Sequence, residues 1–198
     1  MYDKNDVEIL ACEPLYKGFF KCNKYTLKHK LFSGEWSAPL QREFFERGKA
    51  AALLAYDKQQ DKVILVEQFR FGAMAGEQSP WLLELIAGMI DEGEEAEQVV
   101  KREAFEEAGL VVGKCQFMLS YLVSPGGTTE TLDLFVADVD STNVEGVFGL
   151  AEEGEDIRVH AVPRELAFEW VKTGKINNAA TIIGLQWLEL NREQGLDI

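Results

Sequence analysis

Three glutamates, Glu103, Glu106 and Glu107, lie close together in a segment rich in Glu, Ala, Gln and Lys. On a helix of about 3.6 residues per turn, their side chains fall within an arc of about 100°. Val99 and Val100 project into the same sector, which places the carboxylates beside an apolar stripe. Acids at the edge of a core need a cation, and Mg²⁺ and Mn²⁺ prefer oxygen ligands. The spacing therefore indicates a divalent metal site, with a solvated acidic helix face as the alternative.

The residues around these glutamates follow a longer pattern. The run that begins at Gly88 reads GMIDEGEEAEQVVKREAFEEAGL and matches the Nudix box over its full length. The fixed positions of the box are filled by Gly88, Glu94, Arg102, Glu103, Glu106, Glu107 and Gly109, and its apolar positions by Ala104 and Leu110. Because so many residues match the required types at the required spacing, the chain resembles the Nudix hydrolases.

This resemblance implies a fold, a reaction and a set of ligands. The fold is of the α+β class: a Nudix α/β/α sandwich with a mixed sheet, here preceded by a small N-terminal antiparallel β-subdomain. The reaction is hydrolysis of a nucleoside diphosphate linked to another group. Two or three Mg²⁺ ions, with Mn²⁺ as the alternative, would be held by Glu103, Glu106, Glu107 and the carbonyl oxygen of Ala87. Glu94 and Arg102 would brace the turn and helix, which makes Arg102 part of the catalytic unit.

Features outside the box resemble the ADP-ribose pyrophosphatase subfamily. Pro125 lies fifteen residues after the box, at about the place where this subfamily carries a proline. Taken alone, an ordinary turn at residues 124–127 is the alternative. Residues 15–20 and 150–160 also resemble this subfamily, and the likeness extends over nearly the whole chain.

In that subfamily the N-terminal β-subdomain is exchanged across a homodimer and helps to build the adenosine site of the partner subunit. The resemblance therefore implies a domain-swapped homodimer. The implied substrate contacts are Phe19, Phe20, Arg42, Glu43 and Arg47 from the N-terminal subdomain, and Arg70, Met89, Ser124, Pro125, Gly126 and Glu130 from the remainder. Aromatic rings and arginines suit adenine and a diphosphate. Packing in the core of the small subdomain is the alternative role for Phe19.

An acidic segment near residue 153 is the expected source of the catalytic base. The residue aligned with the base of the family is Glu153, and Glu155 would be a ligand of a third metal ion. Chemistry alone does not distinguish these two from Glu152 and Asp156, and a flexible loop without a role is the alternative. A base on a mobile loop can close over the attacking water and exclude solvent.

Apolar periodicity and turn residues predict the elements that position these side chains. Strands are predicted within residues 7–46 and at residues 51–56, 63–69, 115–123, 129–138 and 157–162. Helices are predicted at residues 94–108, 164–173 and 178–190, and a loop at 143–156. We expect residues 1–47 to form the β-subdomain, for dimerisation and the adenosine site, and residues 48–198 to form the Nudix hydrolase domain.

Composition excludes several classes of protein. The chain has 198 residues, 46% of them hydrophobic, and a formal charge of −14, which disfavours binding to the nucleic-acid backbone. It contains no apolar run long enough to span a membrane and no signal-peptide pattern at its start. The three cysteines show no metal-type spacing, so a reducing, cytoplasmic location is expected.

We therefore expect Mg²⁺-dependent hydrolysis of the pyrophosphate of ADP-ribose to AMP and ribose 5-phosphate. One alternative is hydrolysis of another sugar nucleotide, such as ADP-glucose or GDP-mannose. The other is a Nudix-fold module that binds ADP-ribose without cleaving it. Such modules usually lose carboxylates of the box, whereas all of them are present here.

Overall fold

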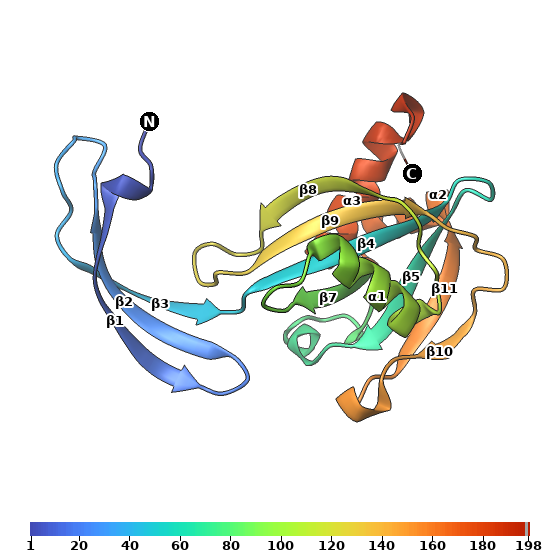
Figure 1. Cartoon of the computed structure of the whole chain (residues 1–198), viewed down its shortest axis with the longest axis horizontal. Coiled ribbons are helices and arrows are strands. Elements are labelled where there is room, and N and C mark those ends of the chain that lie inside the picture. Colours follow the sequence, from blue (N-terminus) through green and yellow to red (C-terminus); the bar gives the residue numbers. More distant parts are fainter. Residues whose placement is uncertain (197) are drawn as a thin grey trace. The chain divides into compact units, whose positions relative to one another are not determined.

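The computed structural model of the chain describes residues 1–196 and 198, apart from the side chains of Glu153 and Gln194. It divides into two compact units (Figure 1). The first contains Met1–Gly48 together with Leu122–Thr131, and the second contains Lys49–Tyr121 and Leu132–Ile198. A segment from the middle of the chain therefore packs with the N-terminal residues.

The first unit is built on three antiparallel strands in the order β1–β2–β3, which confirms the predicted N-terminal sheet. Their bounds are Val7–Lys17, Lys21–His29 and Leu40–Glu46. All 11 residues of the edge strand β1 are exposed. They include the large apolar residues Val7, Ile9, Leu10, Leu15 and Tyr16, which are 44–62% exposed. Apolar surface of this extent is typical of a region that contacts another molecule.

Backbone hydrogen bonds attach the mid-chain segment to β3. The N–H of Phe45 donates to the carbonyl of Gly127 at 2.9 Å, and the N–H of Thr129 donates to the carbonyl of Phe45 at 3.1 Å. The hydroxyl of Thr128 donates to the same carbonyl of Phe45 at 3.0 Å. These bonds hold the turn that begins at Ser124 beside the N-terminal sheet.

The second unit has an eight-stranded sheet in the order β10–β11–β5–β4–β9–β8, with β6 paired to β5 and β7 paired to β4. The strands are β4 (Lys49–Asp57), β5 (Lys62–Phe69), β6 (Trp81–Glu84), β7 (Ile86–Ile90), β8 (Cys115–Leu122), β9 (Thr131–Asp138), β10 (Gly146–Phe148) and β11 (Ile157–Pro163). Alternate residues of β4 enter two cores, because side chains of a strand point to opposite faces: Leu53 packs with residues of α1, and Leu54 packs with residues of α2 and α3. Helices therefore cover both faces of the sheet, which confirms the predicted α/β/α sandwich.

Three α-helices complete this unit: α1 (Ala96–Ala108), α2 (Arg164–Lys172) and α3 (Ala179–Asn191). Helix α1 ends at Gly109, whose φ of +64° is the left-handed conformation that glycine adopts readily. Helix α3 begins after Asn178, whose side-chain oxygen accepts a hydrogen bond from the N–H of Thr181 at 3.2 Å. In the part of the chain that the structure describes, no helix has the length and apolar character needed to cross a membrane.

Three strands were absent from the sequence prediction. Strands β6 and β7 are short and are separated by Leu85 alone, so neither gives a clear alternating pattern. Strand β10 lies within residues 143–156, where the sequence predicted only a loop, and that expectation was wrong. Its three residues pair with β11 in register, for example Val147 with Arg158, and local composition does not reveal such pairing.

A buried aspartate at the end of β4 gives the second unit a predictable response to acid. The carboxylate of Asp57 is 3% exposed and accepts hydrogen bonds from Gln59, Gln60 and both the N–H and the hydroxyl of Ser141. Burial opposes ionisation of Asp57, but these hydrogen bonds outweigh it and lower the pKa from 3.8 to about 2.

Because the folded state lowers this pKa, the carboxylate stabilises the fold above pH 3.8 and loses that effect as the pH falls through about 2. The shift corresponds to about 2 kcal/mol at neutral pH. Chemical denaturation between pH 2 and 7 should therefore show a weaker pH dependence for Asp57→Asn than for the wild type. Asp133→Asn, on β9, serves as the control and should keep the wild-type dependence.

Candidate active site

Strand β7 and helix α1 meet where the box begins and where its glutamates project. A Cβ atom on Gly88 would overlap the carboxylate of Glu103, so glycine at this position lets the glutamate lie directly against the strand. On the same strand, the N–H of Ala87 donates to the carboxylate of Glu107 at 3.1 Å. The two carboxylates therefore lie against neighbouring backbone positions of β7.

Glu107 is buried, and Glu103 is largely shielded from water. Glu107 is 3% exposed, and the side chain of Glu103 is 14% exposed. Burial raises the pKa of Glu107 to about 8, opposed by the N–H of Ala87 and assisted by the charges of Glu103 and Glu155. Burial likewise raises the pKa of Glu103 to about 7, although the nearby Arg102 lowers it. The surroundings of Glu103 and Glu107 therefore supply too little positive charge to stabilise both side chains in their ionised form.

This donor set fits a hard divalent ion, because carboxylate oxygens are its preferred ligands and its charge would compensate the buried acids. Among the side chains that the structure describes, however, no three from Asp, Glu, His and Cys are gathered as a ligand set. Arg102 holds the oxygens of Glu103 and Glu106 at 2.8 and 3.2 Å. An ion bound by these two glutamates would compete with Arg102 for their oxygens.

Arg102 also reaches towards the start of the helix. Its guanidinium lies 3.6 Å from Glu94, whose carboxylate accepts a hydrogen bond from the N–H of Asp91 at 3.1 Å. The helix itself begins at Ala96, two residues later than predicted. Arg102 thus connects three of the acidic residues of the box through one guanidinium.

The acidic loop contributes one described carboxylate to this region. Glu155 accepts a hydrogen bond from the N–H of Leu150 at 3.0 Å, and its charge raises the pKa of both Glu103 and Glu107. Glu155 therefore lies within electrostatic reach of the buried pair. The side chain of Glu153, the predicted base, lies outside the described part of the structure; its backbone ends the short 3₁₀ helix Ala151–Glu153.

Three of the predicted substrate residues contact one another in the first unit. The guanidinium of Arg47 lies 4.5 Å from the centre of the Phe20 ring, and its Nε donates to Glu130 at 3.0 Å. Glu130 comes from the mid-chain segment, more than 80 residues further along the chain. The stacked guanidinium and the carboxylate form one polar and aromatic cluster.

The remaining substrate residues of the first unit are exposed. Phe19 is 92% exposed and packs edge-on against Phe20, with ring centres 4.8 Å apart, so the alternative of core packing is wrong for Phe19. The structure places Arg42 and Glu43 on β3, and Ser124, Pro125 and Gly126 in the turn of the mid-chain segment. None of these side chains is needed to fill a core.

In the second unit, Arg70 follows β5 and Met89 lies on β7, 39% exposed. The Nε of Arg70 donates to the carboxylate of Glu84 at 2.9 Å, and the charge of Arg70 lowers the pKa of Glu107. Sequence reasoning gave Glu84 no role. Its partner Arg70 lies 14 residues earlier, just after the neighbouring strand β5, and no local sequence pattern predicts such a pair.

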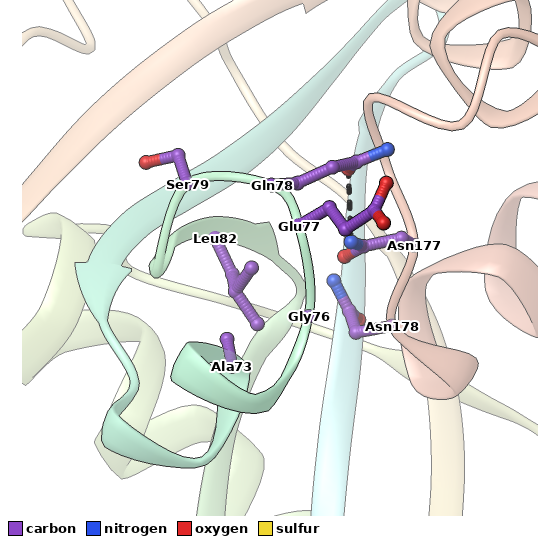
Figure 2. Close-up of a pocket in the computed structure, with 8 residues that line it drawn as sticks. All are labelled: Ala73, Gly76, Glu77, Gln78, Ser79, Leu82, Asn177 and Asn178. Atoms are coloured by element: carbon purple, nitrogen blue, oxygen red, sulfur yellow. Dashed lines mark hydrogen bonds between the residues drawn. The ribbon is translucent and has the colours of Figure 1, made fainter.

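A cavity of about 510 Å³ lies beside the loop that begins at Arg70 (Figure 2). Its lining residues are Ala73, Gly76, Glu77, Gln78, Ser79, Leu82, Asn177 and Asn178. The side-chain amide of Asn177 donates to that of Gln78 at 2.9 Å, and the amide of Asn178 donates to the carbonyl of Leu83 at 2.7 Å. These bonds attach the loop and β6 to the start of α3. None of the predicted site residues is among those that line this cavity.

The close approach at Gly88 makes a specific prediction. Gly88→Ala should force the carboxylate of Glu103 away from β7, and a displacement of about 1 Å in a catalytic group costs about 100-fold in rate. The midpoint of thermal unfolding should change little, because the overlapping atoms end a flexible side chain. Gly113→Ala is the matched control, since a Cβ there meets no atom within 4 Å. Full activity of Gly88→Ala would contradict the proposed importance of this contact.

Comparison with known proteins gives consistent matches. Residues 46–183 match the NUDIX domain family. The chain is 53% identical over 192 residues to the "ADP-ribose pyrophosphatase" of Escherichia coli (strain K12), covering 97% of this chain and 92% of that protein. It is 50% identical over 196 residues to the protein of the same name from Haemophilus influenzae, covering 98% and 90%.

More distant relatives share the fold. A "GDP-mannose pyrophosphatase" from Yersinia pestis is 37% identical over 190 residues, covering 93% of this chain and 92% of that protein. A solved structure described as "Crystal structure of ADP compounds hydrolase" superposes with a TM-score of 0.72 over 98% of this chain and 99% of the other, at 20% identity. At that level of identity, the superposition supports the fold alone.

Proposed function

The chain belongs to the Nudix family, and on that premise we propose that it hydrolyses the pyrophosphate of ADP-ribose to AMP and ribose 5-phosphate with the help of Mg²⁺. The observation that carries this proposal is that the buried Glu107 and the largely shielded Glu103 both lie against the Ala87–Gly88 backbone. The 53% identity to an ADP-ribose pyrophosphatase over 97% of the chain supports this choice of substrate.

The residues of the second unit suggest how the reaction would proceed. Glu103, Glu106, Glu107 and the carbonyl of Ala87 would hold two or three divalent ions, with Glu155 as a further ligand. When bound, these ions would neutralise phosphate charge and make a water more acidic. Arg70 would bind a phosphoryl oxygen and stabilise the charge that develops there. Glu153 would accept the proton of the attacking water.

The first unit would supply the adenosine half of the site. We propose a homodimer in which Phe19 and Phe20 of one copy bind the adenosine half of the substrate held by the other copy. The exposed apolar residues of β1 and the exposed ring of Phe19 support a partner for this surface. The Arg47–Glu130 ion pair beside Phe20 supplies polar groups for the sugar or the diphosphate.

A substrate panel tests the proposed reaction. Release of phosphomonoesters would be measured with ADP-ribose, ADP-glucose and GDP-mannose in the presence of Mg²⁺. The highest kcat/KM is expected for ADP-ribose. A flat profile or a preference for another compound would keep the hydrolase and reject ADP-ribose as its preferred substrate, whereas binding without any turnover would favour a non-hydrolytic module.

GDP-mannose is the second candidate substrate, because the relative from Yersinia pestis is 37% identical over nearly the whole chain. The two candidate substrates differ in the base and in the sugar, so the residues of the first unit that are proposed to bind the nucleoside should discriminate between them. Phe19→Ala should raise KM much more than it lowers kcat if the ring binds the nucleoside. An unchanged KM would remove Phe19 from the site.

A further inference from the structure

Arg70 is fixed at both its backbone and its side chain. Its N–H donates to the carbonyl of Pro80 at 2.8 Å, and its carbonyl accepts from the N–H of Ala73 at 2.9 Å, which closes the base of the intervening loop. The Gln78–Asn177 bond attaches this loop to the segment before α3 (Figure 2). The backbone from which the guanidinium extends is therefore well anchored.

Glu84 holds the side chain of Arg70 from one edge. Its carboxylate accepts the hydrogen bond from Nε at 2.9 Å, and its side chain is 16% exposed, against 47% for Arg70. Glu84 faces the same side of the sheet as Val66, its register partner on β5, and Val66 packs in the core that α1 covers. The carboxylate therefore lies on the face of the sheet that carries the buried glutamates.

The opposite edge of the guanidinium is left available. Among the hydrogen bonds of the described residues, none is donated by either Nη nitrogen of Arg70. Arginine presents its donors in a planar fork, and such a fork binds phosphate oxygens in a bidentate manner. With Nε engaged by Glu84, the free edge of the fork can serve a phosphate.

We propose that Glu84 is a positioning residue for substrate binding: it fixes the Nε edge of Arg70 and thereby presents the Nη edge to a phosphoryl group of the substrate. This inference deepens the proposed function and rests on it. A carboxylate suits this role better than an amide, because hydrogen bonds between charged groups are stronger than those between neutral ones. The low exposure of the Glu84 side chain, 16%, limits competition from water for its carboxylate.

A double-mutant cycle tests this role. Steady-state kinetics with ADP-ribose would compare the wild type, Glu84→Gln, Arg70→Ala and the double variant, with thermal unfolding measured for each. Glu84→Gln leaves an amide oxygen that can still accept from Nε but removes the negative charge. A hydrogen bond between charged groups is about twice as strong as a neutral one, so Glu84→Gln should lower kcat/KM by a factor of about 10. In the Arg70→Ala background the same substitution should have no further effect, because its target is absent.

Glu67→Gln is the matched control. Glu67 lies on β5 and bonds to His160 at 2.8 Å, and its register partner is Leu83 on the opposite face from Glu84. This variant should retain wild-type kinetics. Glu84→Gln should keep a normal midpoint of thermal unfolding, because it removes a charge that burial destabilises.

A second measurement separates this inference from the proposed function. Calorimetry with inorganic pyrophosphate and Mg²⁺ reports phosphate binding without turnover, and both Glu84→Gln and Arg70→Ala should weaken it non-additively. If the wild type does not cleave ADP-ribose but the binding cycle shows this coupling, the proposed substrate fails and the role of Glu84 stands. Equal losses from Glu84→Gln in both backgrounds, or no loss, would overturn that role.

Discussion

Replacing Glu107 by Gln is expected to lower the rate of hydrolysis by about 10³-fold or more while the protein remains folded. The amide has nearly the same size and can still accept the hydrogen bond from Ala87, but it carries no charge to bind a divalent ion. Metal ions contribute several kcal/mol to such reactions, which corresponds to a factor of about 10³ in rate.

The thermal stability of Glu107→Gln should not fall with its activity. Burial raises the pKa of Glu107 to about 8, so the fold opposes the charged form of this side chain. Without metal, Glu107→Gln should therefore unfold at the same temperature as the wild type or above it. Glu97→Gln, an exposed position of α1 paired with Lys101, is the control and should keep full activity. Near-normal turnover of Glu107→Gln would remove this carboxylate from catalysis, and unfolding of the variant would assign it a structural role instead.

Removing divalent ions is the second experiment with a large expected effect. EDTA should abolish turnover, and an excess of Mg²⁺ should restore it. Without a metal ion, the neighbouring residues supply too little positive charge to compensate the carboxylates of Glu103 and Glu107. Restoration by Mn²⁺ is also expected, since it prefers similar oxygen ligands. Turnover that persists in EDTA would reject a metal-dependent mechanism.

Binding of the ion should also be visible without substrate. A ligand that binds only the folded state stabilises it by about 2.7 kcal/mol at a concentration of 100 times Kd. The midpoint of thermal unfolding of the wild type should therefore rise as Mg²⁺ is added. Glu107→Gln should show a smaller rise, whereas Glu97→Gln should follow the wild type.

The part of the site that could be predicted from the sequence is local along the chain. Helix α1, its end at Gly109 and the clustering of the glutamates follow from residue types at fixed spacing, and the structure places these carboxylates at the edge of an apolar stripe. The contact between Gly88 and Glu103 shows why a glycine stands at the start of the box. In this helix, residues at the fixed spacing of the box are also neighbours in the folded structure.

The remaining features depend on strand register, which residue periodicity does not reveal. The Arg70–Glu84 pair exists because β5 and β6 pair in one particular alignment. Likewise, Arg47 meets Glu130 only because the mid-chain segment hydrogen-bonds to β3. The short strand β10 forms because it pairs with the neighbouring strand β11. Such contacts need the backbone hydrogen-bond pattern of the folded chain.

The discontinuity of the first unit has a consequence for how the protein can be divided or recombined. Three chain crossings join the two units, at residues 48–49, 121–122 and 131–132. A deletion that stops at Gly48 would leave Gly127 and Thr129 without their backbone partners on β3 and would free the turn that carries Ser124. The N-terminal strands and this turn therefore form one structural unit. A functional chimera with a related protein would have to exchange both segments together.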